Sequence, residues 1–250
     1  MPAEIVTRTA PSPTGYLHLG HAYSAGLAYL RAMKSGGRFL FRIEDIDATR
    51  CRPEYTPAII EDFAWLGLRW EEPVRCQSQH FPDYAAALEQ LRQRGLLYPC
   101  FCTRRQIQTE IAAAGHAPHD LTPHGFEGRV YPGTCRHLSP DERAPRIAAG
   151  EAYALRLDMD AACAQVPRWP LAWHDAQEGA QSVTPGLLTA GFGDVVLARK
   201  EIPTSYHLCV SHDDALQGVT LITRGADLFA ATHLHRLLQE LFGWPVPLYA

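Results

Sequence analysis

The 250-residue sequence has no long hydrophobic run, since no apolar stretch reaches the roughly 18 residues that a membrane-spanning helix needs. It also lacks a basic excess, because 23 Lys and Arg are opposed by 27 Asp and Glu, a formal net charge of −4. A nucleic-acid partner would therefore need a local basic patch. The start, Met-Pro-Ala-Glu, has no basic segment followed by an apolar one, so we expect no secretion signal.

Regularly spaced cysteine pairs are missing as well. The seven cysteines are odd in number and irregular in spacing, which argues against a disulfide framework. A reducing cytoplasm is expected, in which some thiols remain free to bind metal. What is present is an ordinary globular composition, 46% hydrophobic and 20% charged, over a length that allows one large domain or two small ones.

A strand, a Pro/Gly turn and a helix start follow one another near the N-terminus. A β-type run at 4–7 leads into the turn, and a helical pattern without proline leaves it over 22–32. In α/β proteins this arrangement builds a phosphate site, because free N–H groups and the helix dipole point at the ligand. Gly20 allows close backbone approach, and His18 and His21 can share one face of the first helical turn. Alone, such a pair would be read as two surface histidines.

Strand and helix patterns alternate along the rest of the chain, which predicts an α/β protein with a parallel sheet wound by helices. Before residue 100 we expect a strand over 38–43, a helix over 57–66, a strand over 74–77 and a helix from 84 to Gly95. The middle contains a helix-like segment over 104–114, a capped helix start at Ser139 and a strand over 153–159, while 160–192 shows no assignable pattern. The sheet pattern is expected to return with strands over 193–200, 203–210 and 219–225, then a helix over 234–242.

A candidate metal site lies in the middle segment. Cys100 and Cys102 form a C-x-C pair, and Tyr131 and Cys135 form a Y-x-x-x-C pair. Three thiolates with one oxygen or nitrogen ligand suit tetrahedral zinc, and thiolate softness argues against magnesium or calcium. The spacing is not that of a common zinc finger, so buried thiols without metal are the alternative. His137 competes with Tyr131 as the fourth ligand and is chemically the more usual choice.

Two stretches carry a resemblance to a known family. Residues 11–21 read Pro-Ser-Pro-Thr-Gly-Tyr-Leu-His-Leu-Gly-His and resemble the "HIGH" signature of class I aminoacyl-tRNA synthetases, in its glutamyl and glutaminyl form. Residues 38–47, Arg-Phe-Leu-Phe-Arg-Ile-Glu-Asp-Ile-Asp, resemble the next signature of that branch. The resemblance implies a Rossmann-like catalytic domain in two halves, 1–99 and 193–250, separated by an inserted zinc-binding, acceptor-type subdomain over 100–192.

The resemblance also implies a site for L-glutamate and ATP. A glutamate has two carboxylates and one ammonium, which two arginines and one carboxylate complement. The residues implied for glutamate binding are expected at the ends of strands or just after them. Tyr206 is the exception, because it lies within a predicted strand. The implied glutamate-binding residues are Arg8, Thr9, Ala10, Pro11, Ser12, Glu44, Tyr206 and Arg224. Those implied for ATP, with Mg²⁺ as its companion ion, are His18, Gly20, His21, Gly225, Asp227 and Leu228, with His18 and His21 catalytic. The implied ligands of one structural zinc are Cys100, Cys102, Tyr131 and Cys135, since a tyrosine is the fourth ligand in the short paralogues of glutamyl-tRNA synthetase.

Two further segments resemble those short glutamyl-Q paralogues, which attach glutamate to queuosine in the anticodon of tRNA(Asp). Val210 stands where glutamyl-tRNA synthetases usually have asparagine, and 224–228 resembles the paralogue pattern. The implied partner is queuosine-containing tRNA(Asp), bound by a cytoplasmic monomer. Its phosphates are expected to contact Arg104, Arg105, Arg129 and Arg136. The lysine loop "KMSKS" is absent from these 250 residues, which leaves open a catalytic fragment of a glutamyl-tRNA synthetase or an inactive tRNA-binding paralogue.

Overall fold

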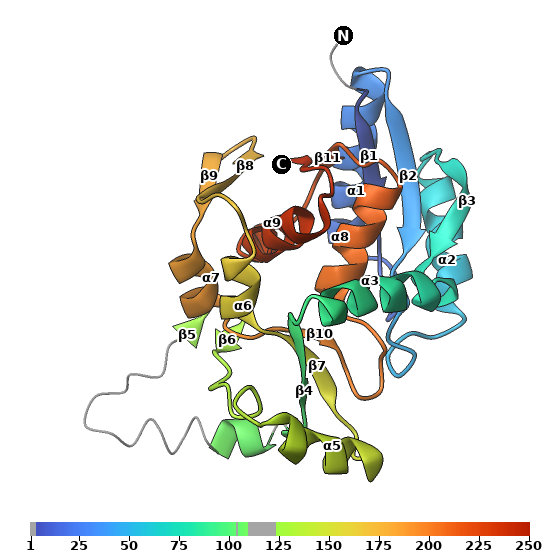
Figure 1. Cartoon of the computed structure of the whole chain (residues 1–250). Helices are drawn as coiled ribbons and strands as arrows, with labels where there is room; N and C mark the ends of the chain where they lie inside the picture. The colour runs from blue at the N-terminus through green and yellow to red at the C-terminus, as the bar shows by residue number, and fades with distance from the viewer. Residues whose placement is uncertain (1–3, 104, 110–123) are drawn as a thin grey trace.

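The computed structural model describes residues 4–103, 105–109 and 124–250 (Figure 1). Three parallel strands come first: β1 (Val6–Thr9), β2 (Arg38–Ile43) and β3 (Glu71–Cys76), in the order β1-β2-β3. Val6 lies opposite Arg38, and Arg42 lies opposite Arg75. All residues of β2 after Arg38 are buried, as expected of a central parallel strand covered on both faces.

A second sheet continues the first. It contains β11 (Leu221–Ile222), β12 (Leu248–Tyr249), β8 (Leu171–Asp175) and β9 (Gly179–Val183), in the order β11-β12-β8-β9. Only β9 runs antiparallel to its neighbour. Thr220 N donates to Val6 O at 2.9 Å and so joins β1 to the edge of β11. The predicted α/β class with a parallel sheet is therefore confirmed, and 160–192 contributes two strands that the sequence did not predict.

Helices pack on both sheets and bury leucine and alanine stripes. Ala25, Ala28 and Ala32 pack with Phe39 and Phe41 in one cluster, whereas a larger cluster contains most of the C-terminal leucines. The main helices are α1 (Leu19–Lys34), α2 (Tyr55–Trp65), α3 (Phe81–Gln93), α8 (Tyr206–Leu216) and α9 (Ala231–Phe242). The shorter ones are α5 (Pro140–Ala148), α6 (Met159–Ala164), α7 (Pro185–Gly191) and two 3-10 turns, η1 (Gln77–Gln79) and η2 (Ala226–Leu228). No helix within the described residues is both long and apolar enough to cross a bilayer.

An antiparallel sheet projects away from the parallel one, with α5 at its far end (Figure 1). It consists of β4 (Leu97–Cys100), β7 (Ala154–Leu157) and β10 (Val196–Ala198), in the order β10-β7-β4. The hairpin of β5 (His124–Gly125) and β6 (Gly128–Arg129) lies nearby. The strand expected over 193–200 is thus present only as β10, and it pairs with β7 rather than with the parallel sheet, because so short a strand carries no signal for its partner.

Two expected strands near the C-terminus are wrong or too long. Residues 203–210 do not form a strand, because Ser205 caps α8 and the chain from Tyr206 onward is helical. This helix is buried on several sides, so its hydrophobic pattern lacks the helical period. The strand expected over 219–225 is shortened to Leu221–Ile222. The helix start at Ser139 is confirmed, with Glu142 N donating to Ser139 Oγ at 3.3 Å. Of the helix expected over 104–114, residues 104 and 110–114 lie outside the described residues.

Candidate active site

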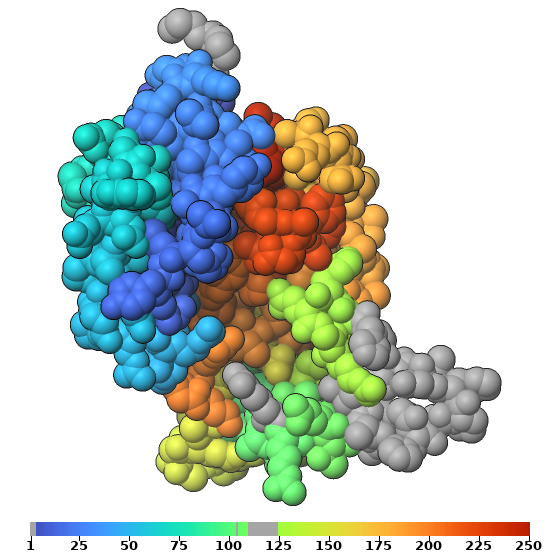
Figure 2. Space-filling view, turned by 180° about the vertical axis from the view of Figure 1, so that it is seen from behind, coloured from blue at the N-terminus to red at the C-terminus, as the bar shows by residue number. Residues whose placement is uncertain are grey.

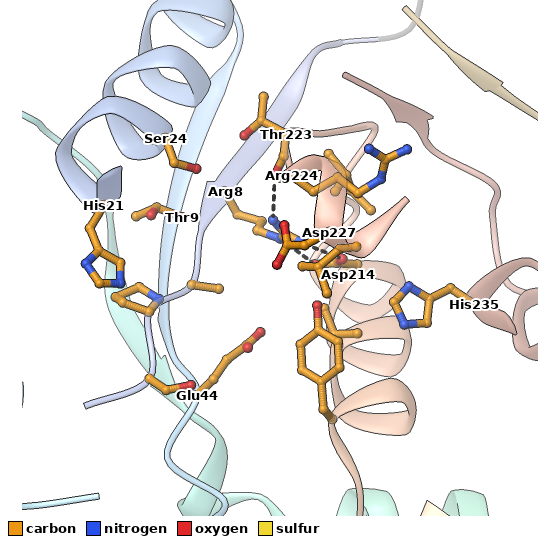
Figure 3. Close-up of a pocket in the computed structure, with 18 of the residues that line it drawn as sticks. Arg8, Thr9, His21, Ser24, Glu44, Asp214, Thr223, Arg224, Asp227 and His235 are labelled. Carbon is orange, nitrogen blue, oxygen red and sulfur yellow. Dashed lines mark hydrogen bonds and ion pairs between the residues drawn. The ribbon is translucent and has the colours of Figure 1, made fainter. Parts of the chain in front are cut away.

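A cavity of about 670 Å³ opens at the C-terminal ends of β1, β2 and β11, against helices α8 and α9. In Figure 2 the surface is hollowed between the blue N-terminal segments and the orange to red C-terminal ones. This edge is where open parallel sheets bind ligands. All the residues predicted to bind glutamate line the cavity, from Arg8 to Ser12 and at Glu44, Tyr206 and Arg224. Segments more than 200 residues apart in sequence therefore meet at one place (Figure 3).

Arg8 reaches the cavity from β1 and is held by an acidic residue of α8. Its Nε and one terminal nitrogen each donate to Asp214 at 3.1 Å, and the other terminal nitrogen donates to Thr223 O at 3.4 Å. Burial would lower the pKa of the Arg8 guanidinium, but the Asp214 carboxylate outweighs it and the pKa is raised. Burial likewise acts to raise the pKa of Asp214, yet Arg8 and Arg42 hold it below its usual value. Both groups are therefore charged, and Arg8 is fixed in position before any ligand enters.

Glu44 follows β2 and faces the cavity beside the fully buried Arg42. Arg42 donates to Glu44 Oε1 at 3.1 Å and to Asp214 Oδ1 at 3.0 Å, so it joins the two carboxylates. Burial raises the pKa of the Glu44 carboxyl, while Arg42 and Arg8 act in the opposite direction. Glu44 makes its carboxylate available to a cationic ligand group at one side of the cavity (Figure 3).

Arg224 lies at the other side of the cavity, just after β11. Its Nε donates to Thr232 Oγ1 at 3.0 Å and one terminal nitrogen donates to Asp175 Oδ2 at 2.8 Å. The guanidinium also lies over the rings of Phe229 (5.0 Å) and Trp173 (5.6 Å). These contacts orient the planar group, and an oriented guanidinium can bind a carboxylate through two parallel bonds.

His18 and His21 begin α1 and form a reciprocal cap. Gly20 N donates to His18 Nδ1 at 3.1 Å, and His18 N donates to His21 Nδ1 at 3.3 Å. A neutral imidazole that accepts at Nδ1 carries its proton on Nε2, so each ring retains one N–H donor. The pKa of His21 is lowered, first by burial and then by His18. The capped helix start thus offers two ring N–H donors in addition to its own dipole, a suitable arrangement for phosphate oxygens.

The residues predicted for ATP are brought together only in part. His21, Gly225, Asp227 and Leu228 line the cavity, whereas His18 and Gly20 are exposed and are not among the lining residues. Asp227 belongs to η2, directly after Arg224. The nucleotide assignments remain predictions, and the geometry places the phosphate-binding candidates next to the glutamate candidates.

The predicted metal ligands converge at the end of the antiparallel sheet. The sulfur atoms of Cys100, Cys102 and Cys135 lie within 4.8 Å of one another, with 3.4 Å between Cys102 Sγ and Cys135 Sγ. The hydroxyl of Tyr131 is 3.4 Å from Cys100 Sγ and 3.6 Å from Cys102 Sγ. His137 is exposed and is not part of this cluster. Three soft sulfur donors and one phenolic oxygen could hold a metal ion such as zinc.

The arginines predicted to contact tRNA phosphates differ in whether they are free to do so. Arg136 is occupied by acidic neighbours, with Asp160 at 2.9 Å and Asp194 at 3.5 Å. Within the described part of the chain, Arg105 and Arg129 are exposed and form no ion pair. Arg104 lies outside the described residues. Two exposed arginines thus remain near the cysteine cluster.

Several residues that shape the cavity escaped the sequence analysis. Asp214 and Arg42 were assigned no role from the sequence, and Asp175 lies in the segment without a pattern. His235 also lines the cavity from α9. The Asp213-Asp214 pair in an otherwise apolar run was the one available signal, because buried acidic residues need cationic partners.

The chain is similar to known proteins over nearly its whole length. Residues 4–250 match the family of class I tRNA synthetases (E and Q), catalytic domain. A protein of Rhodobacter capsulatus named glutamyl-Q tRNA(Asp) synthetase is 49% identical, over 98% of this chain and 85% of the relative. A protein of the same name from Symbiobacterium thermophilum is 43% identical, over 97% of this chain and 72% of the relative. A glutamate tRNA ligase from Elizabethkingia meningosepticum, solved in complex with its amino acid, superposes with a TM-score of 0.80 at 27% identity, and this chain spans 49% of its length.

Proposed function

The chain belongs to the class I tRNA synthetases of the glutamate and glutamine type, and we propose that it activates L-glutamate with ATP and transfers it to queuosine in the anticodon of tRNA(Asp). The observation that carries this proposal is the single cavity in which Arg8, Arg224 and Glu44 meet beside the N-terminus of α1. The names of the relatives at 49% and 43% identity support the choice of acceptor. The protein is thus an ATP-dependent ligase.

The cavity complements a glutamate molecule by charge. Glu44 on one side suits the α-ammonium, and Arg224 on the other side suits the side-chain carboxylate. Arg8 lies between them, already fixed by Asp214 (Figure 3). The ammonium and the α-carboxylate then lie toward His21, where the phosphates of ATP are expected. Val210 also lines the cavity, so an apolar side chain stands at the position that separates the short paralogues from glutamyl-tRNA synthetases.

Adenylate formation follows from this placement. An α-carboxylate oxygen attacks the α-phosphorus of ATP, the new C–O–P bond forms, and the bond to the β-phosphate oxygen breaks with release of pyrophosphate. Negative charge grows on the phosphate oxygens in the transition state. The two Nε2–H groups of His18 and His21 are donors fixed by capping bonds, so they need little reorganisation to stabilise that charge. Mg²⁺ enters with ATP.

The second step places the activated acyl group on an RNA hydroxyl. The adenylate is a mixed carboxylic–phosphoric anhydride, so a well-positioned hydroxyl of the queuosine cyclopentene ring can attack its carbonyl carbon. The new ester bond forms, the bond to the phosphate oxygen breaks with release of AMP, and the hydroxyl proton leaves with the AMP phosphate or to solvent. Arg105 and Arg129 are exposed and could contact the RNA backbone on the side of the cysteine cluster.

A zinc ion is the metal that best fits the cysteine cluster. Cys100, Cys102, Cys135 and Tyr131 would hold it, and its role would be structural, since four protein ligands leave no open position for a substrate. Tyr131 is preferred over His137 because its hydroxyl already lies 3.4 and 3.6 Å from two of the sulfur atoms, whereas His137 is exposed. The zinc would tie β4 to the segment before α5.

Pyrophosphate exchange with purified full-length protein tests the function. We expect glutamate-dependent exchange without any tRNA, because all the residues proposed for glutamate and four of the six proposed for ATP line one cavity of this domain. Exchange that strictly requires tRNA would favour a glutamyl-tRNA synthetase instead. No exchange under either condition would favour an inactive tRNA-binding paralogue. Glutamine and aspartate serve as amino acid controls.

A further inference from the structure

A chain of three hydrogen-bonding side chains runs from the β5–β6 hairpin into the cavity. His207 Nε2 lies 3.0 Å from Glu127 Oε1, and His207 Nδ1 lies 3.1 Å from His235 Nε2. Glu127 belongs to the hairpin turn, His207 to α8 and His235 to α9. Figure 2 shows the light green hairpin segment against the red-orange C-terminal segment. The cavity is therefore connected to the hairpin through two imidazoles in series.

His235 forms the inner end of this chain. Its side chain is 8% exposed, and its ring points from α9 toward the side of the cavity that holds Arg8 and Arg224 (Figure 3). Within the described residues no hydrogen bond is formed by its Nδ1. The remaining ring nitrogen is thus available to a ligand. The ring also contacts Tyr206, with centroids 5.9 Å apart.

The hydrogen-bond partners of His207 and His235 determine whether His235 Nδ1 donates or accepts a hydrogen bond in the cavity. Glu127 is ionised, because its hydrogen bond with His207 lowers the pKa of its carboxyl. A carboxylate only accepts, so His207 must donate through Nε2. Burial, His207 and the two arginines hold the pKa of His235 well below its usual range, so His235 itself stays neutral. A neutral His235 can present Nδ1–H to the cavity only if its Nε2 accepts a hydrogen bond from an N–H at His207 Nδ1. His207 then carries protons on both nitrogens, and Glu127 balances the charge.

We propose that His235 reads the side-chain carboxylate of glutamate, donating Nδ1–H to it when His207 is doubly protonated against Glu127. This inference rests on the proposed function and names a further specificity residue of the same cavity. The ligand carboxylate stabilises the proton on His235 Nδ1, which in turn favours a proton on His207. Glu127 and His207 are positioning residues, whereas His235 touches the substrate. Only the charged state of His207 selects against glutamine, since a carboxamide is uncharged and gives no such stabilisation.

The charged groups around the chain are compatible with this state. Arg8 and Arg224 face His235 from β1 and from the segment after β11, and Asp214 faces it from α8. A ligand carboxylate would be shared by these cations and the imidazole. His207 meets Glu127 from the hairpin, His235 from α9 and Tyr206 on its own helix. Arg129, Arg156, Asp194 and Arg199 line the neighbouring cavity of about 260 Å³, which His207 borders.

Three substitutions at two positions, His235 and His207, test the proposal by their effect on the KM for glutamate in pyrophosphate exchange. His235→Ala is expected to raise this KM about tenfold or more, with little change in the KM for ATP, because a hydrogen bond to a charged group is lost. His207→Leu should act in the same direction. His207→Asn should restore most of the affinity, because its amide takes the place of the ring Nδ1 and its N–H can donate permanently to His235 Nε2. An equal loss in the leucine and asparagine variants would overturn the proposal.

Proton uptake separates this proposal from the general function. Calorimetric titration of glutamate in two buffers of different ionisation enthalpy, over pH 6.5 to 9, should show uptake of up to one proton per glutamate in the native protein at the higher pH values. His207→Asn should abolish that uptake, and Glu127→Gln should weaken it. Glu61→Gln, an exposed glutamate of α2, is the control for loss of one surface charge. If the native protein binds glutamate and takes up no proton at any pH in this range, the proposed role of the Glu127–His207–His235 hydrogen bonds is refuted. Glutamate activation itself would remain intact.

Discussion

Arg224 is the residue whose loss should separate ligand binding from folding. Arg224→Ala removes a guanidinium from the cavity, so we expect glutamate activation to fall by about 100-fold or more. Asp175 loses its 2.8 Å partner but still accepts from Gln177 N and Glu178 N at 2.9 and 3.0 Å. The cost in unfolding free energy should therefore be about 1–3 kcal/mol. Pyrophosphate exchange and chemical denaturation measure the two effects.

Two further variants make the Arg224 test interpretable. Arg224→Lys keeps the charge without the planar fork and should remain strongly impaired. Asp175→Asn in the Arg224→Ala background removes the unpaired carboxylate, so stability should recover while activity does not. Near-normal glutamate affinity in Arg224→Ala would remove Arg224 from the site.

Glu44 should give glutamate binding a dependence on pH. Burial raises the pKa of its carboxyl, and only the ionised form can hold an ammonium group. As pH falls through that raised pKa, Glu44 is neutralised and the KM for glutamate should rise, at a higher pH than for an ordinary carboxyl. Glu44→Gln should raise the KM about tenfold or more at neutral pH and abolish this acidic limb. A limb that survives the substitution would assign it to another group.

Most residues of the proposed glutamate site were predicted from the sequence, but the residues that hold their side chains in position were not. Arg8, Glu44 and Arg224 were predicted from the family resemblance, and their places at or just after strand ends of a parallel sheet agree with it. Asp214 and Arg42 were not, because their partners are 206 and 172 positions away in the chain. A pattern of neighbours along the sequence carries no information about such distant pairs. His235 escaped for the same reason.

At the scale of elements, the start of α1 combines a helix cap with two ring donors. His18→Ala removes both functions, and we expect a loss of about 1 kcal/mol of stability together with a large fall in kcat. His18→Asn separates them, because asparagine is a good N-cap but has no imidazole N–H. It should keep the melting temperature near native while kcat still falls by about 100-fold. A native kcat in His18→Asn would mean that only the helix dipole acts on the phosphates.

Elements were predictable where one face is buried and a cap is present. The helix at Ser139 has a cap, a proline and a reaching glutamate, and the structure agrees. Helix α8 was read as a strand because Leu208, Cys209 and Val210 are all buried, so the apolar run resembles a core strand. The partner of β10 was missed because pairing is decided by the whole fold rather than by three residues.

The stability of the region that joins β4 to Cys135 should depend on zinc. Purified protein made with zinc available is expected to carry about one zinc per chain, and Cys135→Ser should lose it. Limited proteolysis should then cut the antiparallel sheet region sooner, while the parallel sheet core stays protected. Cys163→Ser, a buried cysteine outside the cluster, is the control. Elemental analysis without zinc in the native protein would mean that these are buried thiols.

At the scale of the whole molecule, there is no excess of positive charge that would attract RNA. The formal net charge is −4, and much of the buried positive charge at the site is balanced by Asp214, Glu44 and Asp175. The RNA must therefore be attracted by local arginines and not by a global field. Arg105→Ala with Arg129→Ala should weaken tRNA binding and reduce its salt dependence, while tRNA-free glutamate activation stays unchanged.

The acceptor should be queuosine-containing tRNA(Asp) and not the 3′ end of tRNA(Glu). The chemical step makes an activated acyl group that any well-placed hydroxyl can take, so the docking surface selects the acceptor. The cavity adjoins a second cavity of about 330 Å³, and the two share Ser12, Glu44, Arg50 and Tyr206, which leaves room for a bulky modified base next to the adenylate. Radiolabelled glutamate should therefore appear on tRNA(Asp) that carries queuosine and be absent from the unmodified tRNA. The label should also survive removal of the 3′-terminal adenosine. Labelling that disappears with that adenosine would instead favour a glutamyl-tRNA synthetase.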